Sequence, residues 1–281
     1  MSAALIIPIL LAAPQKLWSE EHGVGMRIPS TWEQAKTSKK GEVFVINGPK
    51  LGGVRPRAVL RDLGESPSTL TDLVGRLSKE LLKRPSWTLA SITRKSIGPA
   101  PCRRLGFFFE VEGDKGRGRV TIVRLGRKVF VLELSAARSH FPATTFDQLE
   151  QSLARKAQKI EGPAGLMFEA PPGWEVEARG VVRLTGPIIE RGPAVMILSH
   201  QSVEVLGGIK GKEGPQVLFL EKKRPTVLAE EKIEKFVIRM LHLEADGYEV
   251  RIMMPAAAWD DLFPIAAGIL KSARLPKEKG K

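Results

Sequence analysis

The sequence contains two copies of one pattern, and this repeat limits the folds that the chain can adopt. In the first copy an apolar segment runs through Ile28-Pro29 into Trp32-Glu33, and the same order returns before Trp174-Glu175. Two later segments also recur along the chain: 43–49 as 181–187, and 129–137 as 249–257. In a chain of 281 residues, such a duplication predicts two domains of related fold.

The second copy is shorter than the first. Trp32 and Trp174 lie 142 positions apart, whereas Leu134 and Met254 lie 120 positions apart. Most of the loss follows the Gly-Pro motif, where the first copy carries an amphipathic helical pattern over residues 70–81. The spacing therefore predicts that the second copy lacks this helix.

The other patterns predict strands and one closing helix in each copy. Strands are expected at 25–28, 42–46, 56–60, 89–93, 106–111, 119–125 and 128–134, and again at 165–169, 181–185, 194–199, 217–221, 236–243 and 248–254. The first closing helix carries Phe146, Leu149 and Leu153, and the second spans residues 260–273. Residues 155–162 are expected to form a linker, 222–225 a charged loop and 230–235 either helix or strand. The class is α+β, with tandem antiparallel-sheet α/β sandwich domains at 16–160 and 161–276.

The positive charge is concentrated in the first copy. The net charge is +13; residues 1–160 hold 27 Lys and Arg against 14 Asp and Glu, and residues 161–281 hold 17 of each kind. Such an excess predicts an acidic protein partner, an anionic membrane surface or nucleic acid. A solvated basic surface without a partner is the alternative interpretation.

The candidate partner-binding residues lie in the late hairpins of the first copy. They share a positive charge and are Arg103, Arg104, Arg117, Arg119, Arg124, Arg127 and Lys128. Aromatic residues form 6% of the chain, which disfavours single-stranded nucleic acid because its bases need stacking partners. We therefore expect an acidic protein partner first and an anionic membrane surface second.

No catalytic, cofactor-binding or metal-binding residues are predicted. The sequence has no phosphate-binding loop, nucleophile elbow or zinc-protease pair, and its four histidines are scattered singly. The single cysteine, Cys102, lacks a partner motif, and residues 113–118 are expected to be a hairpin tip. Asp260 and Asp261 suit the start of a helix better than an acid–base pair. The chain is expected not to be an enzyme and to need no cofactor.

The first 15 residues form an apolar leader. They are about as long as the apolar part of a secretory signal, although the basic residues that usually precede it are missing. We expect export to the periplasm or cell envelope, or a cytoplasmic protein if the leader is not a signal. Residues 277–281 are expected to form a basic tail.

Short motifs of the first copy resemble the PsbP-like superfamily, which includes PsbP, a small Ran-binding nuclear transport factor and bacterial DcrB-like proteins. The motifs are Ile28-Pro29 with Trp32, Asn47-Gly48-Pro49, and Phe146, Leu149 and Ser152-Leu153. The resemblance covers residues 22–157 well and 164–275 weakly. It implies an α/β/α sandwich without a catalytic constellation, which acts through protein contacts.

The expected function is that of a non-catalytic interaction or accessory module of the bacterial cell envelope. The alternative is a chaperone-like protein or a lipid-surface binder that holds apolar segments on the sheet face left uncovered in the second copy. Apolar residues on both faces of the strands at 194–199 and 236–243 would favour this alternative. An enzyme of unrecognised type is the third hypothesis.

Overall fold

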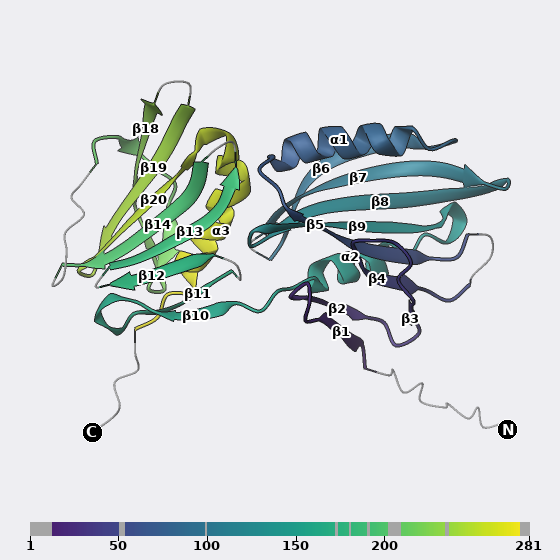
Figure 1. The fold of residues 1–281 in the computed structure, drawn as a ribbon, viewed down its shortest axis with the longest axis horizontal. Helices are drawn as coiled ribbons and strands as arrows, with labels where there is room; N and C mark the ends of the chain where they lie inside the picture. The colour runs from purple at the N-terminus through teal and green to yellow at the C-terminus, as the bar shows by residue number, and fades with distance from the viewer. Residues whose placement is uncertain are drawn as a thin grey trace, which may run out of the picture.

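The chain forms two units that lie side by side (Figure 1). The computed structural model describes residues 13–50, 54–98, 100–171, 174–179, 181–189, 192–201, 209–233 and 236–275. The predicted tail and most of the predicted leader lie outside the described residues. None of the described helices is long and apolar enough to cross a membrane.

The first unit is built from a hairpin, a seven-stranded antiparallel sheet and two helices. Its strands are β1 (Gln15–Ser19), β2 (Val24–Ile28), β3 (Glu33–Ala35), β4 (Glu42–Asn47), β5 (Arg57–Glu65), β6 (Thr88–Ile97), β7 (Ala100–Val111), β8 (Asp114–Leu125) and β9 (Lys128–Ala137). The described strands of the sheet follow the order β3-β4-β5-β9-β8-β7-β6, and β1 pairs with β2 beside it. Helix α1 (Leu70–Leu82) and helix α2 (Ala143–Ser152) complete the unit.

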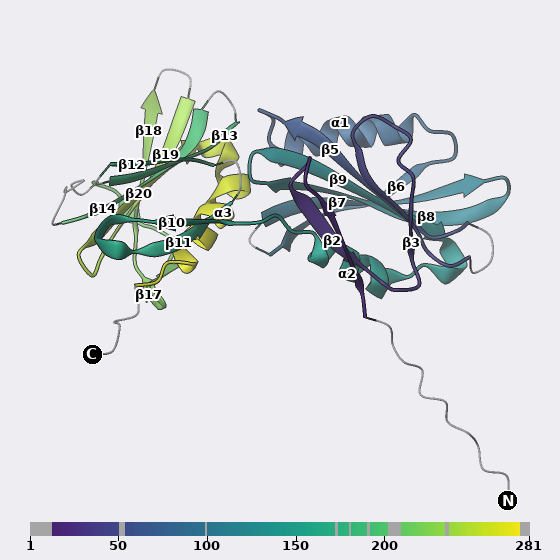
Figure 2. The same ribbon diagram turned by 60° about the horizontal axis from the view of Figure 1, so that its bottom comes forward.

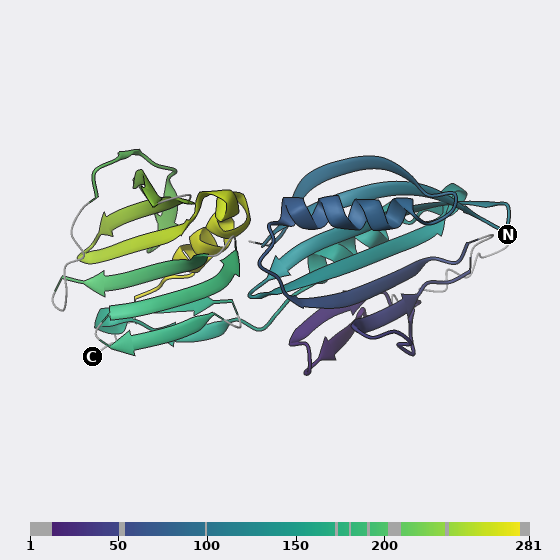
Figure 3. The ribbon, with the colours of Figure 1, turned by 45° about the horizontal axis from the view of Figure 1, so that its top comes forward.

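The two helices cover opposite faces of the first sheet, and Figure 3 shows α1 lying across one of them. Thr69 caps α1, because its hydroxyl accepts a hydrogen bond from the backbone N–H of Asp72. The apolar stripe of α1 packs on Leu105, Phe107 and Ile122, whereas Phe146 of α2 packs in a second cluster with Leu132. This arrangement is the predicted α/β/α sandwich.

The second unit repeats the strand order of the first. Its strands are β10 (Gln158–Glu161), β11 (Met167–Ala170), β12 (Glu175–Arg179), β13 (Val181–Ile189), β14 (Gly192–His200), β15 (Lys212–Glu213), β16 (Val217–Phe219), β17 (Lys222–Arg224), β18 (Val227–Ile233), β19 (Phe236–Ala245) and β20 (Tyr248–Pro255). The described part of the sheet runs β12-β13-β14-β20-β19-β18-β15, so β20 takes the central place that β9 takes in the first sheet. The hairpin β10-β11 corresponds to β1-β2, and helix α3 (Trp259–Lys271) corresponds to α2.

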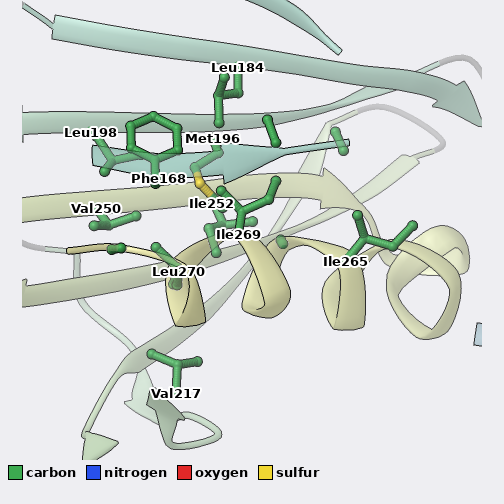
Figure 4. Packing of buried hydrophobic residues seen from close by; sticks show 14 of the residues in the cluster. Phe168, Leu184, Met196, Leu198, Val217, Val250, Ile252, Ile265, Ile269 and Leu270 are labelled. Atoms are coloured by element: carbon green, nitrogen blue, oxygen red, sulfur yellow. The ribbon is translucent and has the colours of Figure 1, made fainter. Parts of the chain in front are cut away.

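The core of the second unit lies between the sheet and α3. Ile269 of α3 points toward Met196 and Ile252 of the sheet (Figure 4), Ile265 points toward the same sheet farther along the helix, and all four are buried. Val217 belongs to the same cluster, because the β16-β17 hairpin packs against α3. One face of the second sheet is therefore covered by a helix, as in the first unit.

The opposite face of the second sheet has no helix on it among the described residues. In the first unit α1 follows β5, whereas the described residues between β14 and β15, at 201 and 209–211, contain no helix. Figure 2 shows α3 on one side of the second sheet, facing the first unit. The fold class is thus confirmed: two tandem α/β sandwich units, the second without a counterpart of α1 in its described residues.

Residues 114–118 of the expected hairpin tip belong to β8 instead, because they pair with β7, and the turn lies at residues 112–113. Three further segments differ from the sequence-based expectations. Residues 158–161 of the expected linker form β10, which pairs with β11 and belongs to the second unit. Lys222–Arg224, expected as a charged loop, forms β17 because it pairs with Val217–Phe219 in a hairpin. Residues 230–233, for which the sequence left helix or strand open, form a strand, since β18 extends to Ile233. In all three, pairing with a neighbouring strand decides a conformation that local composition left open.

Candidate functional site

The seven candidate basic residues lie on both faces and at one turn of the first sheet. Arg103 is buried, and its Nη2 lies 3.3 Å from Oδ1 of Asp261 in α3. Arg124 is fully buried and donates to the carbonyl oxygens of Ser66 and Ser68, at 3.0 and 2.7 Å. Both therefore face the junction of the two units rather than solvent.

Two more of these arginines hold α2 on its face of the sheet. Arg104 pairs with Glu150 and, at 3.2 Å, with Asp147, and Arg119 reaches Asp147 at 2.6 Å. Glu150 is buried and also accepts from the hydroxyl of Thr121 at 2.6 Å. A buried carboxylate such as that of Glu150 needs partners, so the charges of Arg104 and Arg119 serve the packing of the helix.

The last three residues differ in exposure. Arg127 bridges Glu65 of the first unit and Glu175 of the second, and Lys128 pairs with Asp62. Arg117 is exposed, with its guanidinium 4.8 Å from the ring centre of Phe141. Binding of an acidic partner to the seven residues stays a prediction, and Arg117 is the exposed member of the set.

The acidic partners of these residues are distant in the sequence. Asp261 is 158 positions from Arg103, and Asp147 is 43 positions from Arg104. No local pattern around the arginines indicated these pairs. A count of charges alone could therefore not separate arginines used inside the protein from arginines available to a partner.

An apolar groove lies on the open face of the second sheet. The cavity of about 580 Å³ is lined by side chains of β14, β18, β19 and β20 and by residues 256–257. Met240 and Met253 face each other across β19 and β20, and Ile238 pairs with Pro255 beside them. Ile233 and Phe236, 45% and 38% exposed, extend the apolar surface at the β18-β19 end.

The groove fits the sequence criterion for apolar-segment binding. Along β14, Val195 and Ile197 lie on the open face, whereas Met196 and Leu198 lie in the core, so both faces carry apolar side chains. Glu231 is the one charged residue among the described residues of the lining. The sequence criterion pointed to the strands, but it could not place Met240 opposite Met253.

The other half of the open face is polar. Ser199, His242 and Glu249 are buried there. Burial, together with the nearby charge of Arg251, lowers the pKa of His242. Among the described residues no group of three or more His, Cys, Asp or Glu is arranged to hold a metal ion.

Comparison with known proteins gives structural likeness alone. No protein-family model and no curated protein sequence matches the chain. The structure resembles cyanobacterial PsbP from Synechocystis (14% identity, TM-score 0.42), covering 56% of this chain and 98% of that one. It also resembles LpqN, involved in cell envelope biogenesis of Mycobacterium tuberculosis (15% identity, TM-score 0.40), covering 50% of this chain and 90% of that one.

A crystal structure from Bacteroides thetaiotaomicron is similar as well. It has 17% identity and a TM-score of 0.39, and the match covers 55% of this chain. The chain spans about half the length of that protein, at 52%. PsbP is thus among the similar structures, as the sequence motifs predicted, and the likeness extends over about half of this chain.

Proposed function

We propose that the protein is a non-catalytic binding protein that holds an amphipathic helix of a partner protein in the groove of the second unit. The observation that carries this proposal is the groove itself, which is apolar and has no covering helix in the described structure. Contiguous exposed apolar surface of this kind marks binding sites in soluble proteins. Helix-in-groove recognition is a common use of such a surface.

The first unit supports a helix as the occupant. At the equivalent register of the first sheet, Leu77 and Leu81 of α1 lie beside Val120 of β8 and Glu133 of β9. In the second unit β19 and β20 take the places of β8 and β9, and Met240 and Met253 are exposed to the groove. In the first unit a helix thus packs on the sheet at this position, and we propose that a partner helix makes the same contact with the sheet of the second unit.

The chemistry of the groove defines the partner helix further. Methionine side chains adapt to different apolar surfaces, so Met240 and Met253 suit leucine-like residues spaced four apart. Glu231, the charged residue of the described lining, favours a basic residue on the same helix. In the first unit a basic residue that follows α1, Arg84, likewise pairs with a glutamate of the sheet, Glu133, at 2.9 Å, although Glu133 holds the position of Met253 and not that of Glu231.

A peptide with the sequence of residues 66–84 tests this proposal, because it reproduces α1 and Arg84. Its fluorescein-labelled form should bind the full chain and gain helicity, measured by anisotropy and circular dichroism. Met240→Glu should weaken binding by about tenfold or more, since it places a charge in the groove. The matched control is Ile92→Glu on the exposed edge strand β6, where the side chain is 52% exposed.

A second peptide separates a helix from any apolar segment. In this second peptide, proline replaces the residue that corresponds to Gly75, which keeps the apolar residues but breaks the helix at its centre. Weaker binding of this peptide supports the proposal, and equal binding of both peptides contradicts it. Binding that Met240→Glu leaves unchanged also contradicts it, because the peptide would then lie elsewhere.

We also propose that the protein works in the cell envelope. The support is the apolar run from Ala3 to Ala13, whose length and composition are typical of the apolar part of a secretory signal. Cell fractionation with N-terminal sequencing of the native protein tests this. Recovery in the envelope with the run removed is the expected result, and an intact cytoplasmic chain would contradict it.

A further inference from the structure

A cleft between the two units combines apolar walls with buried positive charge. Its volume is about 370 Å³, within the range of about 300–1,000 Å³ that is typical of small-ligand sites. The first unit contributes the end of β8 and the segment after α2, and the second contributes Ala170 and one side of α3. Leu125, Leu153, Ile265 and Ile269 make the walls apolar.

Arg124 and Arg155 supply the positive charge of the lining, and Glu169, which is exposed, supplies its acidic group. Arg155 donates from Nε to the carbonyl oxygen of Gly23 and from Nη1 to that of Leu125. Burial lowers the pKa of both arginines, which reflects the cost of removing their charge from water.

Arg124 is the more deeply buried of the two arginines. Its side chain is fully buried, its Nη groups contact two neutral carbonyls, and its Nε has no hydrogen-bond partner. Within the described residues no carboxylate lies within 4.0 Å of it. The nearby Asp261 is engaged by the N–H of Leu70 and by Arg103. A buried cation without an ion pair is costly, and an anion in the cleft would offset that cost.

We propose that this cleft binds a small amphiphilic anion, with its head group at Arg124 and Arg155 and its apolar chain along Leu153, Ile265 and Ile269. A carboxylate and a phosphate monoester share the required head-group chemistry, since arginine donates paired hydrogen bonds to both. The ligand lies between the two units, so it contacts both and stabilises their junction. This site is separate from the groove of the second unit and does not depend on it.

Binding of 11-(dansylamino)undecanoic acid to the full chain, followed by fluorescence, tests the proposal. Decanoate and decyl phosphate are competitors that share the anionic head, and decanol is the neutral competitor of equal chain length. Arg124→Met should weaken binding by about tenfold or more because it removes the buried charge. Arg117→Met is the matched control, since it makes the same change at an exposed arginine of the same strand.

A second variant tests the cleft independently, because Arg124→Met could weaken binding through a folding defect. Ala157 is an exposed residue of the cleft lining, so Ala157→Trp should fill the cleft and leave the fold intact. It should also weaken binding by about tenfold or more, because the apolar chain loses its space. Urea unfolding of each variant confirms that the fold is retained.

The outcomes separate the sources of the anion. Competition by decanoate alone identifies a carboxylate ligand, and competition by decyl phosphate alone identifies a phosphate ligand; both results support the site. Equal competition by decanol overturns the role of the arginines. Unchanged binding in Ala157→Trp, or no binding of the probe at all, overturns the site. Met240→Glu should leave this binding unchanged, and a loss there would move the probe to the groove.

Discussion

The carboxylate Oδ2 of Asp261 accepts a hydrogen bond from the backbone N–H of Leu70 at a distance of 2.6 Å. Leu70 is the first residue of α1 in the first unit, and Asp261 lies in the first turn of α3 in the second. The first N–H groups of a helix lack partners within the helix, so Asp261 satisfies one of them from the other unit. The same carboxylate contacts Arg103, and both side chains are buried.

Loss of this carboxylate should destabilise the junction. Asp261→Ala leaves the Leu70 N–H and the buried Arg103 guanidinium without their acceptor, and we expect a loss of about 3 kcal/mol in the free energy of unfolding. Urea unfolding followed by circular dichroism measures it. The control is Asp260→Ala, which removes an exposed pair with Arg94 and should cost below about 1 kcal/mol. Equal effects of the two substitutions would contradict this role for Asp261.

The repeated fold could be predicted because its signals are local. The apolar spacing of residues 70–81 gave α1 within one residue of its end, and the Trp and Gly-Pro motifs recur where Trp32 and Trp174 pack. Gly48 lies against Trp32 and Gly186 against Trp174, so a Cβ at either glycine would approach the ring within 3.0 Å. The two copies therefore keep the same close contact, which explains why the motif is visible in the sequence.

The candidate site was less accessible to prediction, because it depends on contacts between distant segments. The sequence pattern placed Arg103 and Arg124 on the surface, yet Arg103 is buried against Asp261 of α3 and Arg124 against the carbonyl oxygens of Ser66 and Ser68. Asp261 was expected to stabilise its own helix, yet its carboxylate serves α1 and Arg103. The spacing predicted that the second copy lacks the first helix, and its described residues contain none there, whereas the shape of the groove required the pairing of Met240 with Met253.

Cys102 should be unreactive in the folded protein. Burial raises the pKa of its thiol to about 11, and the charge of Glu150 adds to this effect. At about pH 8 the thiolate, which is the reactive form, is then a small fraction of the thiol. We expect negligible reaction with Ellman's reagent in the native protein and one reactive thiol in guanidinium chloride. Rapid reaction of the native protein would contradict the burial of Cys102.

Asp62 should make the stability of the first unit sensitive to acid. Burial alone would raise the pKa of Asp62, but hydrogen bonds from His22, Lys128 and the N–H of Gly64 outweigh it and hold the pKa below its usual value. Because the folded pKa is depressed, the ionised group stabilises the fold above the unfolded pKa of about 3.9. This contribution is lost as the pH falls from there through the folded pKa.

Comparison with Asp62→Asn measures this contribution. The variant should be less stable than the wild type at neutral pH, and the difference should shrink as the pH falls from about 4 through the depressed folded pKa, because the wild-type carboxylate becomes protonated over that range. Urea unfolding at several pH values gives both curves. Asp114→Asn at the exposed tip of the β7-β8 hairpin is the control and should leave the curve unchanged. A difference that stays constant into acid would show that Asp62 acts through its shape and not its charge.

Gly118 in β8 allows the aromatic cluster beside α1 to form. The ring of Phe107 lies over Gly118, where an added Cβ would come within 2.3 Å of it and within 2.8 Å of the carbonyl oxygen of Leu134. Phe107 in turn stacks on Trp87 with ring centres 4.3 Å apart. Gly118→Ala should therefore displace Phe107, lower the free energy of unfolding by about 2 kcal/mol and weaken the near-UV circular dichroism of Trp87.

Gly75→Ala is the matched control: its Cβ would meet nothing within 4 Å on α1, so it should raise the free energy of unfolding by about 1 kcal/mol. An unchanged free energy of unfolding in Gly118→Ala would mean that the Phe107 ring is free to move. In that case α1 alone would cover this part of the first sheet.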